Sequence, residues 1–255
     1  MSVLSRLNYY RRIFPAYLTS QKSQLSFWHE VPEVNENFDP VRLGEYYMSF
    51  FSKADYPGSY DQDGIPLLNY HGKLGLQYNP IAIAQYGLGN YNQFCRTGDS
   101  ERRQKFIAVA NWLISNLEQN SSGLWVWHHH FDWEYRTLLK APWYSGLAQG
   151  QGISLLLRAY KLTGEKKYLD TANLAFESFN KEIKEGGVIY VDGEGAVWIE
   201  EYIVDPPTHI LNGFIWALWG VYDYYLGTND KIAKKIFDHC TQTIAKNLYK
   251  YDTGF

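Results

Sequence analysis

Apolar residues recur at helical spacing in three stretches of the chain, and each stretch is interrupted once near its middle. The stretches begin at Pro80, Leu147 and Ile210. A glycine lies at each interruption, and these glycines are Gly98, Gly164 and Gly227. Glycine readily adopts the left-handed conformation that ends a helix, and the acidic or amide residues that follow suit the start of the next helix. The pattern therefore predicts three pairs of helices joined by tight turns.

The interruptions recur at a nearly constant distance. Gly98 and Gly164 are 66 residues apart (164 minus 98), and Gly164 and Gly227 are 63 residues apart (227 minus 164). A fixed period is typical of stacked structural units that share one core. We therefore predict a mainly all-α fold, an (α/α) barrel or toroid of helix hairpins with small β-hairpin insertions. Residues 79–255 would form this toroid as a catalytic domain, which we expect to be incomplete.

The two helices of each pair differ in composition. The second helix carries alanine and large aliphatic residues at helical spacing, which is typical of an outer layer. The first helix carries small and polar residues, as expected where a ligand or a neighbouring backbone comes close. These residues include Gly146, Gly150, Gly152, Asn212 and Gly213. We expect the first helices to lie inside and to line a central cavity.

Between the pairs lie aromatic, strand-like segments at residues 123–130 and 187–199. Asp192-Gly193 stands between two β-branched runs and predicts a hairpin. Residues 20–78 contain many prolines, glycines and aspartates, so we expect loops there and a short helix from Leu43 to Phe51. Residues 1–78 would form an N-terminal irregular or helical segment that packs on the barrel.

Composition narrows the possible functions. The 255 residues carry 24 basic and 27 acidic side chains, and a net charge of -3 does not favour a nucleic-acid partner. Aromatic residues make up 17%, with 22 Tyr and 9 Trp, which suits the stacking of sugar rings. No apolar run is long enough for a signal peptide or a membrane segment, so we expect a soluble protein, cytoplasmic or of unknown compartment. Cys95 and Cys240 form no disulfide framework and match no metal spacing.

Three blocks carry a specific resemblance. They are Tyr78-Asn-Pro-Ile-Ala-Ile-Ala-Gln-Tyr86, Trp143-Tyr-Ser-Gly-Leu-Ala-Gln149-Gly-Gln-Gly, and Glu200-Glu-Tyr202 followed by Leu211-Asn-Gly. In this order they resemble the C-terminal domain of D-glucuronyl C5-epimerases over roughly residues 66–255. The resemblance implies an isomerase without a cofactor, acting on an anionic uronic-acid polysaccharide. It would convert D-glucuronate to L-iduronate in a heparosan-like chain, and it could be a homodimer.

The resemblance also implies catalytic residues. A family tyrosine that moves protons corresponds to Tyr202, with Glu201 beside it. Two further family tyrosines follow a Tyr-Asp-Thr-Gly motif, and this chain ends at Tyr251-Asp-Thr-Gly-Phe255. We therefore expect that the ring is incomplete, that the first helix of the third pair has an uncovered apolar face, and that the 255 residues alone exchange no C5 proton.

Epimerisation at C5 needs a base, an acid and a cation for the uronate carboxylate. A phenol has a pKa near ~10, so Tyr202 would need donors or cations to act as a base. Glu201 could orient Tyr202, accept its proton, or act as the base if its own pKa is raised. Arg158 could bind the carboxylate or could equally be a helix-packing arginine. The expected substrate-binding residues are Tyr78, Gln85, Tyr86, Trp143, Tyr144, Gln149, Arg158, His209 and Asn212.

The sequence leaves other functions open. Adjacent residues of a strand alternate faces, so His128, His129 and His130 cannot all reach one ion, and we expect no metal. A polysaccharide lyase on the same kind of fold would begin with the same proton abstraction. A glycoside hydrolase would need two carboxylates, for which Asp132, Glu134, Glu200 and Glu201 are the candidates, but no sequence block supports it. A glycan-binding toroid without catalysis is the non-enzymatic alternative.

Overall fold

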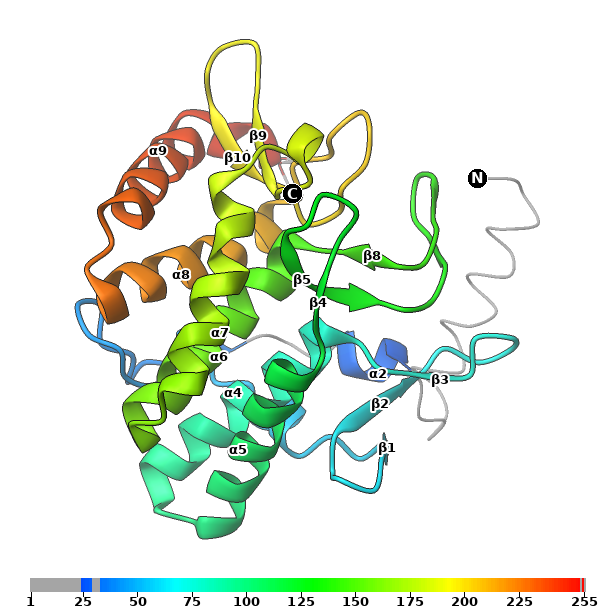
Figure 1. The fold of residues 1–255 in the computed structure, drawn as a ribbon, viewed down its shortest axis with the longest axis vertical. Helices are drawn as coiled ribbons and strands as arrows, with labels where there is room; N and C mark the ends of the chain where they lie inside the picture. Colours follow the sequence, from blue (N-terminus) through cyan, green and yellow to red (C-terminus); the bar gives the residue numbers. More distant parts are fainter. Residues whose placement is uncertain (1–23, 29–32, 253, 255) are drawn as a thin grey trace.

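The computed structural model describes residues 24–28, 33–252 and 254, and three helix pairs dominate it (Figure 1). The first pair is α4 (Pro80–Thr97) and α5 (Ser100–Ser115), the second is α6 (Gly146–Thr163) and α7 (Lys166–Phe176), and the third is α8 (Leu211–Thr228) and α9 (Lys231–Asn247). The repeat in the sequence therefore corresponds to three consecutive helix hairpins, as predicted. Residues 1–23 of the expected N-terminal segment, and Thr253 and Phe255 of the terminal motif, lie outside the described residues.

The tight turns follow the prediction in two of the three pairs. Gly98 ends α4 with φ 70°, and Gly164 ends α6 with φ 73°. In the third pair the prediction of Gly227 is wrong, because α8 continues to Thr228 and Asn229 takes the left-handed conformation with φ 58°. Asparagine tolerates this conformation better than most residues. Gly227 instead lies inside the helix, facing the side chains of Leu43 and Leu157.

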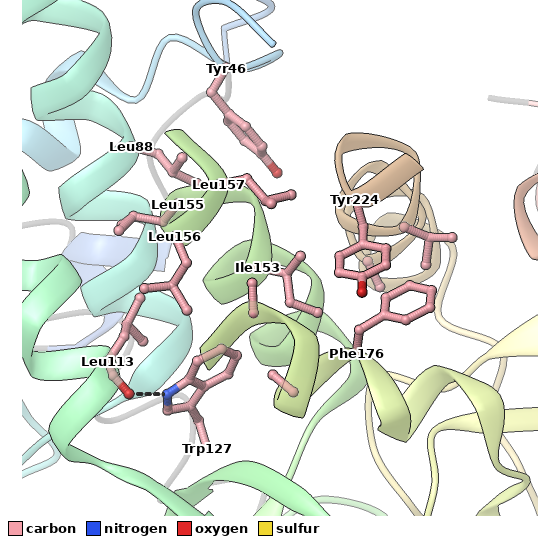
Figure 2. Packing of buried hydrophobic residues seen from close by; sticks show 14 of the residues in the cluster. Tyr46, Leu88, Leu113, Trp127, Ile153, Leu155, Leu156, Leu157, Phe176 and Tyr224 are labelled. Atoms are coloured by element: carbon pink, nitrogen blue, oxygen red, sulfur yellow. Dashed lines mark hydrogen bonds between the residues drawn. The ribbon is translucent and has the colours of Figure 1, made fainter. Parts of the chain in front are cut away.

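The first helix of each pair is the more buried one. α4 is buried from Pro80 to Asn92, and α6 is buried from Gly146 to Ala159 and packs against both α4 and α8. The second helices bury one stripe each, which in α5 is Phe106, Val109, Ala110 and Leu113. Figure 2 shows apolar side chains of α6, including Ile153 and Leu156, packed between neighbouring elements. The predicted inner and outer layers are therefore present.

Helices α6 and α8 cross with their backbones in direct contact. A Cβ atom on Gly150 would lie 2.6 Å from both the Cα and the carbonyl oxygen of Ala217. A Cβ atom on Gly220 would meet the backbone of Gly150 in the same way. Only residues without a side chain allow this approach, which sets the spacing of the two helices.

We predict that Gly150→Ala lowers the free energy of unfolding by about 1–3 kcal/mol, because a backbone contact cannot relax as a side chain can. This loss would appear even though alanine favours a helix interior by ~0.5–1 kcal/mol over glycine. Gly193→Ala is the control, since no atom lies within 4 Å of its added Cβ. Urea unfolding of both variants measures the difference, and equal stabilities would show that the two helices can move apart freely.

Short strands and turns surround the helices. One three-stranded sheet has the order β4 (Leu117–Gln119), β5 (Trp125–His129), β8 (Trp143–Tyr144), and another consists of β1 (Ser59–Tyr60), β2 (Pro66–Asn69) and β3 (Leu76–Gln77). Two-stranded ladders join β6 (Trp133–Glu134) to β7 (Leu138–Leu139) and β9 (Ile189–Val191) to β10 (Val197–Ile199). The short helices are α2 (Gln24–Trp28), α3 (Phe51–Ala54), η1 (Glu177–Asn180), η2 (Ile183–Glu185) and η3 (Leu248–Tyr251). The hairpin predicted at Asp192-Gly193 is confirmed, because β9 and β10 flank it.

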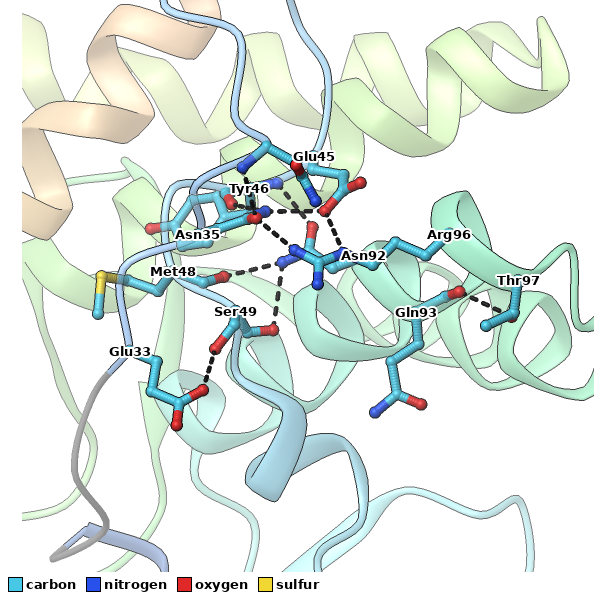
Figure 3. A network of polar contacts seen from close by, with 11 residues as sticks. Glu33, Asn35, Glu45, Tyr46, Met48, Ser49, Asn92, Gln93, Arg96 and Thr97 are labelled. Carbon is cyan, nitrogen blue, oxygen red and sulfur yellow. Dashed lines mark hydrogen bonds and ion pairs between the residues drawn. The ribbon is translucent and has the colours of Figure 1, made fainter.

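Residues 33–50 run along the inner helices without forming the helix expected from Leu43 to Phe51; α3 begins only at Phe51. Asn92 of α4 accepts a hydrogen bond from the Tyr46 amide at 2.7 Å and donates to the Met48 and Ser49 carbonyls at 2.8 and 3.2 Å (Figure 3). Side-chain bonds of this kind replace the bonds that a helix would have made within itself.

The same segment covers the inner face of the third pair. Trp216 lies 5.6 Å from Phe50 between ring centroids, and Trp219 lies 4.9 Å from Tyr47. Tyr222 donates a hydrogen bond to the Pro40 carbonyl at 2.8 Å. The expectation of an uncovered apolar face on α8 is therefore wrong along this stretch, because the N-terminal segment packs on it.

Candidate active site

A cavity of about 450 Å³ lies where the N-terminal turns of the three inner helices converge. Its lining comprises Trp28, Lys53, Tyr70, Asn79, Ile81, Gln85, Phe131, Trp133, Trp143, Leu147, Glu201, Tyr202, Asn212 and Trp216. Asn79 caps α4 and Leu147 belongs to the first turn of α6, while Asn212 belongs to the first turn of α8. Seven of the lining side chains are aromatic. A mainly apolar lining with a few polar groups is typical of small-ligand pockets.

Glu201 is the acidic group of this cavity. It is 8% exposed, and burial raises the pKa of its carboxyl from 4.5 to about 7, with the Tyr202 hydroxyl acting in the opposite direction. Its Oε2 atom has no hydrogen-bond partner within the described part of the chain. The carboxylate packs against Gly213 of α8, where a Cβ atom would collide with it. The glycine after Asn212 therefore makes room for this acid.

Tyr202 stands beside Glu201 with its ring among other aromatic rings. The ring centroid lies 4.5 Å from that of Tyr135 and 5.7 Å from that of Trp143. Burial raises the pKa of the Tyr202 hydroxyl above 10, and the charge of Glu201 raises it further. The phenol therefore holds its proton at neutral pH, when the Glu201 carboxyl is near the midpoint of its titration.

We predict that the contribution of Glu201 to the free energy of unfolding falls as the pH rises from about 4.5 to about 7 and is then constant. Below pH 4.5 the carboxyl is protonated in both states, and between the two values only the unfolded chain releases the proton. The full loss above pH 7 is about 3 kcal/mol. Glu201→Gln should lack this fall and gain stability relative to the unmodified protein at pH 8, whereas Glu194→Gln, an exposed control, should keep it. Denaturant titrations at pH 4.5 and pH 8 measure the effect, and identical pH profiles for both variants would contradict it.

Glu200 has a structural task distinct from that of its neighbour. It is fully buried and accepts hydrogen bonds from the Thr208 and His209 amides at 3.2 and 3.1 Å and pairs with His209 Nδ1 at 2.5 Å. His209 has a positive φ of 49° and stacks on Trp198 at 4.2 Å. These contacts hold the loop between Tyr202 and α8 in place, and His209 itself is not part of the cavity lining.

Three of the expected binding residues line the cavity, namely Gln85, Trp143 and Asn212. Trp143 donates from its indole nitrogen to the Phe131 carbonyl at 2.8 Å, which fixes its ring in the wall. Gln85 donates to Gln151 Oε1 at 3.2 Å, so its amide is held by a neighbouring inner helix.

The other expected binding residues lie outside the lining, and their polar atoms are used elsewhere. Gln149 accepts from the Trp127 amide and donates to the Trp125 and Ala175 carbonyls, so it braces β5 against the helices. Tyr144 donates to the Gly186 carbonyl at 2.7 Å. Tyr78 donates to Asp61 at 2.7 Å near the surface, and the Tyr86 ring is buried 5.7 Å from that of Tyr60.

Arg158 lies outside the cavity lining and is held by an ion pair. Its guanidinium is 1% exposed and pairs with Asp223 at 2.5 Å, and it also donates to the Gly44 and Ser154 carbonyls at 2.9 Å. These bonds engage all three guanidinium nitrogens, and Arg158 is not part of the cavity lining. Of the two interpretations of Arg158, the structure supports the packing arginine.

Known proteins are similar to the part of the chain that contains these site residues. The family model described as D-glucuronyl C5-epimerase C-terminus matches residues 119–255, which include Trp143, Glu201 and Tyr202. The chain belongs to the D-glucuronyl C5-epimerase family. A D-glucuronyl C5-epimerase of Caenorhabditis elegans is 34% identical over 174 residues, covering 61% of this chain and 27% of that protein. An uncharacterised protein of Methanocaldococcus jannaschii is 28% identical over 151 residues, covering 58% of this chain and 49% of its own.

The chain thus spans between about a quarter and a half of the length of these curated relatives. A solved structure with a similar fold is a family 76 glycoside hydrolase, a mannosidase from Bacteroides thetaiotaomicron, with a TM-score of 0.50. It is 16% identical, and the match covers 77% of this chain and 50% of that one. At this identity the likeness concerns the helical fold alone.

Several lining residues of this epimerase-family chain were missed by sequence reasoning. Asn79 lay within a recognised block, and its position before Pro80 signalled a helix cap. Lys53 and Tyr70 gave no signal, because residues 20–78 have no periodic pattern. Trp28 and Trp133 were not distinguishable from core tryptophans. Only the folding of distant segments onto the inner helices brings these side chains together.

The histidine triplet behaves as its spacing predicted. His128 Nδ1 and His130 Nε2 both approach Glu118 Oε2, at 3.1 and 3.2 Å, on one side of the strand. His129 lies on the other side, fully buried and stacked on Trp143 at 3.7 Å, and burial lowers the pKa of its imidazole to about 3. In the described residues no group of three or more His, Cys, Asp or Glu side chains could hold a metal ion. No helix in that part of the chain is long and apolar enough to cross a membrane.

Proposed function

We propose that this cavity epimerises a uronic acid at C5 within a polysaccharide, converting D-glucuronate to L-iduronate in a heparosan-like chain. Family membership supports epimerase chemistry. The observation that carries the proposal is the pair of groups that Glu201 and Tyr202 place in one aromatic cavity, a carboxyl with its pKa raised to about 7 and a phenol with its pKa raised above 10.

The two groups suit the two halves of the reaction, so this proposal departs from the expectation that the 255 residues alone exchange no C5 proton. The ionised Glu201 carboxylate accepts the C5 proton, and the electron pair left behind is delocalised into the substrate carboxylate. The Tyr202 hydroxyl delivers its own proton to C5 and is reprotonated from solvent. Groups whose environments separate their pKa values in this way are typical acid and base partners. Inversion requires that C5 of the sugar lies between the acceptor and the donor, so the contact between the Tyr202 hydroxyl and the Glu201 carboxyl must open when the sugar binds.

The cavity also weighs against glycoside hydrolysis. That reaction uses two carboxyl groups on either side of the bond to be cleaved. Within the described lining, Glu201 is the one carboxyl group, and Glu200 is engaged by the backbone of the following loop. The aromatic rings of Trp133 and Trp143 would stack on the sugar faces.

We also propose that the three hairpins are consecutive sectors of an (α/α) toroid.

Incubation with heparosan followed by analysis of the uronic acids tests this function. Epimerisation predicts the appearance of iduronate in chains of unchanged length. A polysaccharide lyase would instead produce shorter chains with an unsaturated uronate that absorbs in the ultraviolet, and this result would overturn the proposal. Binding of heparosan with no change in either property would favour the glycan-binding alternative.

A further inference from the structure

Tyr70 places a hydroxyl group in the wall of the cavity. It directly follows strand β2 and is 4% exposed. Its ring packs beside Phe131 and Trp133, with ring centroids 4.7 and 5.7 Å away. The proposed reaction gives this hydroxyl no task, since the proton transfers belong to Glu201 and Tyr202. A buried polar group needs hydrogen-bond partners, so the bonds of this hydroxyl decide what it can do.

Two side chains donate hydrogen bonds to the Tyr70 oxygen. Asn79 donates from Nδ2 at 2.8 Å, and Trp28 donates from its indole nitrogen. The direction of the Asn79 bond is fixed, because its Oδ1 atom already accepts from the Ile81 and Ala82 amides at the start of α4. An indole N–H can only donate. The Tyr70 oxygen is therefore the acceptor in both bonds, and its own hydrogen takes part in neither.

The hydroxyl hydrogen of Tyr70 is left for a ligand. Among the described residues it has no acceptor, and burial raises the pKa of the phenol, so the hydrogen stays in place at neutral pH. Other donors of the lining are engaged within the protein, since Gln85 donates to Gln151 and Trp143 donates to the Phe131 carbonyl. Bonds accepted by a hydroxyl oxygen also polarise its O–H group. The cavity therefore offers a ligand a strong donor at Tyr70.

A hydroxyl that can only donate suits a ligand group that only accepts. A sugar hydroxyl both donates and accepts, whereas an ionised carboxylate only accepts. Hydrogen bonds to an ionised acceptor are also roughly twice as strong as those between neutral groups. Of the groups on a uronic acid, the carboxylate is therefore the best partner for Tyr70.

We propose that Tyr70 donates a hydrogen bond to the carboxylate of the uronic acid whose C5 proton is exchanged, an inference that rests on the proposed function. Negative charge moves into this carboxylate when C5 loses its proton, and a donor held in place by the protein stabilises that charge where water is excluded. The bond also selects uronates over neutral hexoses of the same shape. Tyr70 thus does with a neutral group what the sequence suggested for the charge of Arg158.

The test compares two ligands and two tyrosines by titration calorimetry. The ligands are a heparosan oligosaccharide and its carboxyl-reduced counterpart, in which glucuronate is replaced by glucose. Tyr70→Phe should weaken binding of the first by about tenfold to a hundredfold and of the second by about threefold or less. Tyr56→Phe is the matched control, since this buried tyrosine of the same aromatic cluster donates to the Leu67 carbonyl at 3.2 Å and is not part of the cavity lining. It should bind both ligands as the unmodified protein does.

The outcomes separate this inference from the proposed function. If the unmodified protein bound neither oligosaccharide, the proposed function would fail and the role of Tyr70 with it. If the unmodified protein bound the carboxylated ligand and Tyr70→Phe weakened both ligands equally, or neither, only the inference would fail.

A second variant answers the same question if Tyr70→Phe does not fold, since that change leaves the Asn79 and Trp28 donors without their acceptor. 3-Fluorotyrosine at position 70 keeps the ring and the hydroxyl, and the fluorine makes the hydroxyl a stronger donor. It should increase the preference of the protein for the carboxylated ligand over the reduced one. An unchanged preference would overturn the inference.

Discussion

Replacing Tyr202 with phenylalanine should slow the exchange of the C5 proton by about a hundredfold to ten-thousandfold, because the variant lacks the hydroxyl that delivers a proton. The ring would remain between Tyr135 and Trp143, so binding of the polysaccharide should change little. Deuterium incorporation at C5 and the binding of a heparosan oligosaccharide measure the two effects separately.

Tyr135→Phe is the control for this substitution. Its ring centroid lies 4.5 Å from that of Tyr202, but Tyr135 is not part of the cavity lining. It should therefore retain nearly full exchange. Equal exchange by both variants would remove Tyr202 from the mechanism. A loss of binding in Tyr202→Phe, with the fold intact, would make the hydroxyl a binding group instead.

Replacing Asp223 with alanine should lower the free energy of unfolding by about 3–5 kcal/mol, because it leaves the Arg158 cation buried without its counter-charge. Asp223 also accepts a hydrogen bond from Tyr47 at 2.9 Å, so the substitution frees a second buried donor. Thermal or urea unfolding measures the loss. Combining it with Arg158→Met should restore much of the stability, since contacting residues are not additive.

The same pair tests the position of Arg158. Neither Arg158 nor Asp223 belongs to the cavity lining, so the folded Arg158→Met/Asp223→Ala protein should bind uronate oligosaccharides as the unmodified protein does. Loss of binding with stability retained would return Arg158 to the substrate site and would contradict the packing role.

The repeat was predictable from sequence because its causes are local. Helical periodicity and the glycines at 98 and 164 decide where the helices run and end, and the structure confirms both. The third turn differed because Asn229 can adopt the same left-handed conformation as glycine, which left Gly227 free to pack inside α8. A pattern of residue types cannot distinguish these two uses of a glycine.

The cavity was only partly predictable because its walls come from distant parts of the chain. Glu201, Tyr202 and Trp143 were found through the family blocks, which lie in and before the inner helices. Lys53 could not be found, because its place depends on a segment that Asn92 and Arg96 hold through long-range bonds. Arg158 was ambiguous because its partner, Asp223, is 65 residues away in sequence.

The most direct test of the central claim is the incorporation of solvent deuterium at C5 of heparosan. The protein is incubated with the polysaccharide in deuterated water, and magnetic resonance spectra report the label while gel filtration reports the chain length. The account predicts deuterium at C5 of both glucuronate and newly formed iduronate, in chains of unchanged length. Chains that bind to the protein but gain no deuterium, or that become shorter with unsaturated ends, would contradict it.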